Sequence, residues 1–271
     1  MHEDEDLTRV LVTLSNAEQT RGAFSEAMAA GREARTLAQR LGDVGSEASA
    51  TGNLALVALK QGRTEEAEAG LMAAVGLFRR TGDQRAVAIG LGNLGVLAVR
   101  RGDPSAAASL HSQALDGARL LRDTALEGWA LANIAGTEIE TGDLNLAADH
   151  VQLGLRKLIE AEDVVTAVST VNTFGRLLAR CGDVAGAAIA WSAASANAAS
   201  MEIPVERDDE EEAEVSTARE MLQPSAWEEC RQRGAELDLS EAMHVLTRRL
   251  RAVAIDAGGS LAESAARDDS V

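Results

Sequence analysis

One interval, forty residues, organises most of this 271-residue sequence, because a glycine returns at that spacing five times. The five are Gly22, Gly62, Gly102, Gly142 and Gly182. An alanine follows each glycine after five residues, and a second small residue follows that alanine after seven. A bulky residue and a small one lie eight and seven residues before each glycine. Columns that keep one phase over this length are typical of a protein that stacks copies of one small unit.

Each period is predicted to be a pair of helices. In the third period Val87, Leu91 and Leu94 have helical spacing, and Gly102-Asp103-Pro104 then ends the helix. Glycine suits the left-handed position after a helix, aspartate the N-cap and proline the first helical residue. We expect Asp143 and Asp183 to repeat this cap, and Thr64 to cap the helix that follows Gly62. A second turn closes each pair, at Leu41-Gly42-Asp43, Thr81-Gly82-Asp83, Leu121-Arg122-Asp123 and Ala161-Glu162-Asp163.

The small and bulky columns predict how the helices pack. Alanine or glycine at a helix crossing lets two axes approach closely, and the bulky column beside it fills the space between layers. One helix pair cannot bury its apolar stripe alone, whereas a stack of pairs does. The sequence therefore predicts an all-α protein, a right-handed α-solenoid superhelix of five helix pairs with a C-terminal helical cap. The pairs are expected at about 4–40, 44–80, 84–121, 124–161 and 164–199.

The pattern resembles the tetratricopeptide repeat (TPR) family over roughly residues 5–200. The resemblance rests on the bulky–small pairs Leu54-Ala55 and Leu94-Gly95, on Ala67 and Ala107 twelve residues later, and on Ala74 and Ala114 seven beyond those. The period differs from the common 34 residues, and the family's frequent proline at the end of the second helix is missing. Longer helices account for both differences, and forty-residue variants are similar to those of kinesin light chains and bacterial transcriptional activators.

A narrower resemblance concerns bacterial regulators. Segments such as Gly92-Asn93-Leu94-Gly95 and Leu77-Phe78-Arg79-Arg80-Thr81-Gly82-Asp83 look like the C-terminal TPR region of signal-transduction ATPases that accompany LuxR-type, SARP-type or cyclase domains. The ending, with Trp227 and the segment 237–242, looks like the end of that group as well. The sequence has no Gly-x4-Gly-Lys-Ser/Thr phosphate loop, so the ATPase domain of those proteins is not expected here.

The C-terminal quarter is predicted to cover the open end of the stack. After a break at residues 201–204, helices are expected near 206–222, 225–236 and 240–255, within a capping region 201–256, because a solenoid needs its apolar end covered. The run 206–214 holds seven carboxylates and one arginine, which is typical of a solvated face. Residues 257–271 are predicted to be a disordered tail.

Composition excludes several classes of function. The net charge of −17 and a pI near 4.7 argue against direct nucleic-acid or membrane binding, which needs a basic surface. No apolar run reaches the length of a membrane span, and the acidic start does not match a secretory signal, so a cytoplasmic protein is expected. Cys181 and Cys230 do not form a metal or redox motif, and His111 and His150 have no recurring acidic partner. We therefore expect no enzyme activity, no metal and no cofactor.

The predicted binding surface is the concave groove that first helices line in the family this chain resembles. Asn53, Asn93 and Asn133 recur there in register, and positions three and seven residues further along share their face. An asparagine both donates and accepts, so a row of them can hold a peptide backbone, and cations at the rim can hold its carboxylates. The candidate peptide- or partner-binding residues are Asn53, Lys60, Asn93, Val96, Arg100, Trp129, Asn133, Arg176 and Arg180.

Each of these residues also has a structural interpretation. The asparagines can instead bond neighbouring helix backbones and fix the register of successive pairs. Lys60, Arg100 and Arg180 lie where a cation complements the C-terminal end of a helix dipole. Trp129 can face the groove or fill the space between layers.

The sequence favours a non-catalytic scaffold that binds a peptide or protein segment, as the sensing part of a bacterial regulatory system. One alternative is a structural oligomerisation module, with the chain as a homo-oligomer, since Leu56 and Val96 leave apolar groove positions. A helical-repeat enzyme is the second alternative, but no clustered acid–base pair supports it.

Overall fold

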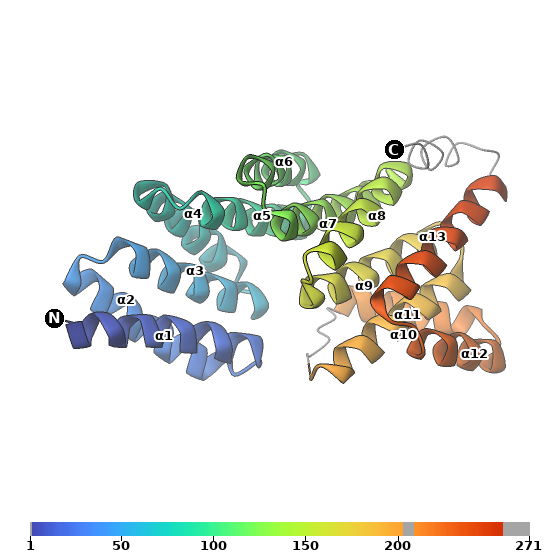
Figure 1. Ribbon diagram of the computed structural model, residues 1–271, viewed down its shortest axis with the longest axis horizontal. Coiled ribbons are helices and arrows are strands. Elements are labelled where there is room, and N and C mark those ends of the chain that lie inside the picture. The colour runs from blue at the N-terminus through green and yellow to red at the C-terminus, as the bar shows by residue number, and fades with distance from the viewer. Residues whose placement is uncertain (1, 203–208, 257–271) are drawn as a thin grey trace. The chain divides into compact units, whose positions relative to one another are not determined.

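The computed structural model describes residues 2–202 and 209–256, and over those residues it consists of thirteen α-helices joined by short turns (Figure 1). The prediction of an all-α protein built from consecutive helix pairs is confirmed. The chain forms two compact units, residues 1–121 and 122–271. Among the described helices, none has the length and apolar character that a bilayer span requires.

The first unit contains three helix pairs. Its helices are α1 (His2–Thr20), α2 (Phe24–Leu41), α3 (Val44–Lys60), α4 (Thr64–Thr81), α5 (Gln84–Arg100) and α6 (Pro104–Leu121). Each helix packs on the next one along the chain, and the first helices of the first two pairs, α1 and α3, also touch. We call the side of α1, α3 and α5 that carries the Asn53 and Asn93 column the inner face.

The second unit contains two helix pairs and three further helices. The pairs are α7 (Thr124–Thr141) with α8 (Leu144–Glu160), and α9 (Val164–Arg180) with α10 (Val184–Ser200). Again the first helices, α7 and α9, pack on each other. The side of α7 and α9 that carries the column of Asn133 and Thr173 is the inner face of this unit.

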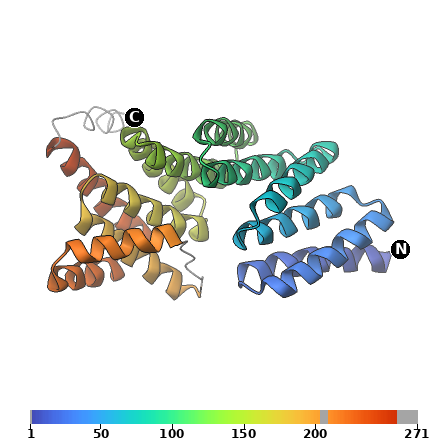
Figure 2. The ribbon, with the colours of Figure 1, turned by 180° about the vertical axis from the view of Figure 1, so that it is seen from behind.

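Three C-terminal helices pack on the second unit: α11 (Asp209–Met221), α12 (Pro224–Ala235) and α13 (Leu239–Asp256). Helix α12 lies on α10, α13 contacts α8, α9 and α10, and α11 contacts α9 and α10. Figure 2 shows α11, in orange, in front of the yellow helices of this unit. The predicted disordered tail, 257–271, and the first residues of the acidic run, 206–208, lie outside the described residues.

The small columns lie where the helices of a pair approach most closely. Ala27, Ala67, Ala107, Ala147 and Ala187 are all fully buried. A Cβ atom on Gly175 would lie 2.6 Å from Nε1 of Trp191, and one on Gly95 would overlap the His111 ring. Glycine in the first helix thus makes room for a large ring in the second. The bulky column changes along the chain, from Leu14, which is 43% exposed, to Phe174, which is fully buried.

The turns follow the predicted chemistry with two exceptions. Asp103 accepts a hydrogen bond from the Ala106 backbone N–H at 2.9 Å, and Asp183 from that of Gly186 at 2.9 Å. The prediction was wrong for Asp143, which makes no capping bond and accepts instead from the Thr141 hydroxyl at 3.0 Å. It was also wrong for Thr64, which is the first residue of α4, because the helix begins one residue earlier than a Thr64 cap requires and Arg63 takes the N-cap position.

Candidate functional site

The three asparagines of the inner face are used in different ways. The Asn53 side chain donates from Nδ2 to the Val12 carbonyl oxygen of α1 at 3.1 Å, which ties α3 to the preceding pair. Asn133 has its Nδ2 buried and without a hydrogen-bond partner among the described residues. Asn93 is half-buried and makes no hydrogen bond to any described residue. Asn53 therefore fixes register, whereas the amide of Asn93 remains available.

Arg100 repeats the geometry of Asn53 one helix pair later. Its Nη1 donates to the Leu59 carbonyl oxygen near the end of α3 at 3.4 Å. Lys60 and Arg100 are both exposed at the C-terminal ends of their helices, as the dipole interpretation expects. Val96 lies half-buried one turn before Arg100. The first unit thus presents an amide, an apolar side chain and a guanidinium along one stripe of α5.

The inner face of α7 combines an aromatic ring with open space. Trp129 is half-buried and lies one turn before Asn133, on the same face of the helix. Gly136 follows on that face, and a Cβ atom added there would meet nothing within 4 Å. The predicted assignment of Trp129 to the groove remains a prediction, since its half-buried ring fits both interpretations.

The two arginines of α9 lie in a small ion-pair network. Arg176 donates from Nε to Glu214 Oε2 of α11 at 2.9 Å, and its Nη2 pairs with Glu140 of α7. Arg180 Nη2 lies 3.4 Å from Glu214 Oε1 and 3.7 Å from Glu140 Oε2. The side chains of Arg176 and Glu214 are only 13% and 18% exposed. Both predicted cations are therefore brought together on the inner face, and α11 supplies a carboxylate to each of them.

The network holds Arg176 firmly in its charged form. Burial by itself lowers the pKa of Arg176, but hydrogen bonding to Glu214 and the charges of Glu214, Glu140 and Glu211 raise it more, so the net shift is upward. Glu140 approaches Arg176 from α7 while Glu214 approaches from α11. The guanidinium is thus held from both sides by carboxylates of the chain itself.

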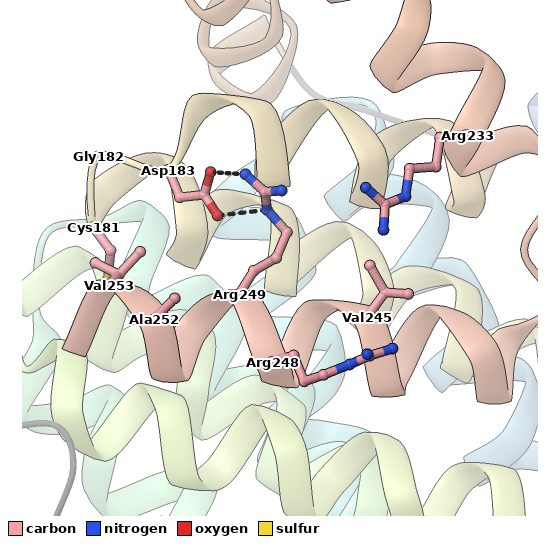
Figure 3. Close-up of a pocket in the computed structure, with 9 residues that line it drawn as sticks. All are labelled: Cys181, Gly182, Asp183, Arg233, Val245, Arg248, Arg249, Ala252 and Val253. Carbon is pink, nitrogen blue, oxygen red and sulfur yellow. Dashed lines mark hydrogen bonds and ion pairs between the residues drawn. The ribbon is translucent and has the colours of Figure 1, made fainter. Parts of the chain in front are cut away.

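A pocket of about 600 Å³ lies apart from the inner face, between the turn at Cys181-Gly182-Asp183 and helices α12 and α13 (Figure 3). The close-up shows Arg249 paired with Asp183, with the Arg249 Nε 2.7 Å from Asp183 Oδ2. Arg233 and Arg248 also line it and make no ion pair with a described residue. Sequence reasoning missed this pocket because its walls come from segments about fifty residues apart or more.

The titratable groups of the described residues are mostly isolated or paired locally. His111 is buried between α5 and α6, and its burial lowers its pKa to about 4. His150 does have an acidic partner, Glu138 of α7, whose Oε2 lies 2.8 Å from His150 Nδ1, but the pair does not recur in other repeats. Burial raises the pKa of the Cys181 thiol, and the charge of Asp183 raises it further. Among the described residues, no three His, Cys, Asp or Glu side chains cluster as metal ligands.

Comparisons with known proteins agree with this architecture. Residues 46–120 match the tetratricopeptide repeat family. The structure is similar to the crystal structure of BtubC (BKLC) from P. vanneervenii, with a TM-score of 0.58, 20% sequence identity, and coverage of 77% of this chain and 88% of that chain. At that identity the likeness concerns the fold alone. No curated protein matches the sequence.

The matched segment covers α3 to α6 of the first unit. Helix-pair repeats of this family generally serve as scaffolds for protein interactions, and such scaffolds are generally non-catalytic. Over residues 46–120 the chain is therefore similar to the helical repeats of such scaffolds, which generally bind other proteins.

Proposed function

We propose that the inner face of α3 and α5 binds an extended peptide or protein segment of a partner. The first helices of TPR-like pairs are where such scaffolds make their contacts, and here they carry amide, apolar and cationic side chains in one stripe. By its resemblance to bacterial signal-transduction regulators, the chain would be the sensing or partner-binding part of a regulatory system. The partner supplies backbone groups to the amides and carboxylates to the cations.

The observation that carries the proposal is the difference between Asn53 and Asn93. The two residues are one period apart in the same column, but of their two helices only α3 packs closely on the first helix of the preceding pair. Asn53 donates to the Val12 carbonyl, while Asn93 makes no hydrogen bond to a described residue. The half-buried Asn93 amide is accessible and can therefore hydrogen-bond a bound peptide backbone.

The test begins with selection of short binding peptides from a displayed random library on the full-length chain. Affinity of a selected peptide is then measured by calorimetry for the wild type and for the Asn93→Ala/Arg100→Ala double variant. We expect about tenfold weaker binding or more, because each lost hydrogen bond contributes roughly 0.5–1.5 kcal/mol. Thermal melting of both proteins shows whether the fold is retained.

A matched control removes the same chemical groups from second helices. The Gln113→Ala/Arg80→Ala variant loses one amide and one guanidinium from exposed positions on α6 and α4. We expect it to bind the peptide like the wild type. Equal affinity of all three proteins, with folding intact, would show that the inner face of α5 is not the site.

A further inference from the structure

Helix α11 occupies the inner face of α9, the surface where a partner segment is expected in a scaffold of this kind. Its Glu214 reaches both Arg176 and Arg180, and its Glu211 lies close enough to add to the potential at Arg176. Val215 packs against the core of the second unit, and Ala218 is buried. These four residues are spaced i, i+3, i+4 and i+7, so they form one face of the helix.

Helix α11 buries fewer side chains against the second unit than α13 does. Among the α11 residues whose side chains are described, Ala218 alone is buried, whereas α13 buries Ala242, Leu246 and Leu250. The Glu214–Arg176 ion pair stabilises the docked position of α11, but α11 has only thirteen residues, and a helix of this length is marginal by itself. Displacing α11 therefore costs far less than displacing α13.

The residues on the docked face of α11 also indicate the chemistry of a partner segment that can replace this helix. Two carboxylates at i and i+3 lie beside a valine and an alanine at i+4 and i+7. The receiving surface offers Arg176, already oriented by Glu140, together with Arg180. Without Glu214, two guanidinium groups face the single carboxylate of Glu140, so the surface favours an anionic segment.

We propose that α11 is a built-in occupant of the inner face of α9, and that an acidic amphipathic helix of a partner protein displaces it to bind Arg176 and Arg180. This rests on the proposed function, which it extends to a second surface and a stated class of partner. The contact of α11 with α9 is then autoinhibitory, and the binding surface opens when a competing helix is present.

The experiment uses the full chain and a fluorescent synthetic peptide with the sequence of residues 209–221 as the competing acidic helix. Glu214→Gln keeps the shape of the side chain but removes the charge that holds α11 to Arg176. We expect the peptide to bind this variant about tenfold more tightly than the wild type, as measured by fluorescence anisotropy. Adding Arg176→Gln to the same chain is expected to abolish binding.

Glu220→Gln is the matched control, because it removes one negative charge from an exposed position of α11 that lies off the docked face. It is expected to bind the peptide like the wild type. Amide hydrogen exchange of 211–221 is followed in parallel, and faster exchange in Glu214→Gln than in Glu220→Gln is expected.

Two results overturn the inference in different ways. Equal, Arg176-dependent binding by the wild type and Glu214→Gln would show that α11 does not compete, while leaving peptide binding itself intact. Faster exchange of α11 in Glu214→Gln without any peptide binding would show that the surface does not accept an acidic helix. Neither result bears on Asn93 and Arg100, so a failure here is distinguishable from a failure of the proposed function.

Discussion

At the scale of single residues, the side-chain volumes at two positions sixteen residues apart are complementary: a large side chain in the second helix faces a small one in the first. Where the second helix carries a ring, as at His111 and Trp191, the first helix carries glycine, at Gly95 and Gly175. Where the second helix carries Leu71, the first carries Ala55. Protein interiors are close-packed, so a gain of volume on one side has to be matched by a loss on the other.

His111 is a buried base, and its burial makes stability depend on pH. Its pKa is lowered from 6.5 to about 4 in the folded chain, so between these values the unfolded chain binds more protons. Stability is therefore complete above pH 6.5 and falls as pH is lowered toward 4. The full loss is about 3 kcal/mol, which we expect to see in urea unfolding measured at a series of pH values.

Replacing His111 separates this effect from the titration of the carboxylates. Leucine occupies the equivalent position of the preceding pair, at Leu71, so His111→Leu is expected to pack and not to titrate. Its unfolding free energy should fall less steeply than that of the wild type between pH 6.5 and 4. The exposed His244→Gln serves as the control and should keep the wild-type slope. Identical slopes for wild type and His111→Leu would refute the assignment.

At the scale of helices, the turns that follow the second helices differ between the early and the later pairs. Gly42 and Gly82 take the left-handed conformation there, with φ of 70° and 77°. At the same position of later pairs, Arg122 and Glu162 adopt φ of 54° and 56°. A side chain in this conformation costs roughly 1 kcal/mol relative to glycine, so the later turns are strained where the earlier ones are not.

Glu162→Gly is therefore expected to stabilise the protein. The substitution restores the residue that two earlier turns use, and the Glu162 side chain makes no hydrogen bond or ion pair with a described residue. We expect a gain of about 1 kcal/mol in the free energy of unfolding by urea. Gly82→Ala makes the opposite change at an equivalent turn and should lose a similar amount. A loss of stability in Glu162→Gly would mean that its side chain contributes more than its backbone costs.

Much of the fold could be predicted from the sequence because its determinants are local. The small columns, the glycines and most capping aspartates act within a single helix pair, so their spacing is visible in the chain. The caps at Thr64 and Asp143 were predicted wrongly for two reasons: α4 begins at Thr64 itself, and the Asp143 carboxylate accepts from the Thr141 hydroxyl instead of capping α8. Arg176 and Arg180 were predicted as a cationic rim, but their partner Glu214 comes from a helix whose docking leaves no periodic signal.

At the scale of the whole molecule, the second unit depends on helices outside the repeats. Helix α10 is apolar on all sides, with Ala187, Ala188, Ile189, Ala190 and Trp191 buried in succession. Helix α9 covers one side, and α12 and α13 cover others. The backbone of α12 comes so close that a Cβ atom on Gly234 would lie 2.4 Å from the Ile189 carbonyl oxygen. The apolar helix α10 is thus covered by the closely packed helices α12 and α13, and it does not expose a polar face to solvent.

A chain that ends at residue 200 should therefore lose the second unit selectively. Without α13, burial of Leu246 and Leu250 disappears, and each contributes about 1.5–3 kcal/mol, which is comparable with the stability of a small domain. We compare it with a chain that ends at residue 256, so that both lack residues 257–271. Amide exchange in α9 and α10 should become much faster in the shorter chain, while exchange in α3 and α4 stays unchanged. Equal protection of α10 in both chains would mean that the helix pairs suffice by themselves, and that the C-terminal helices serve binding rather than stability.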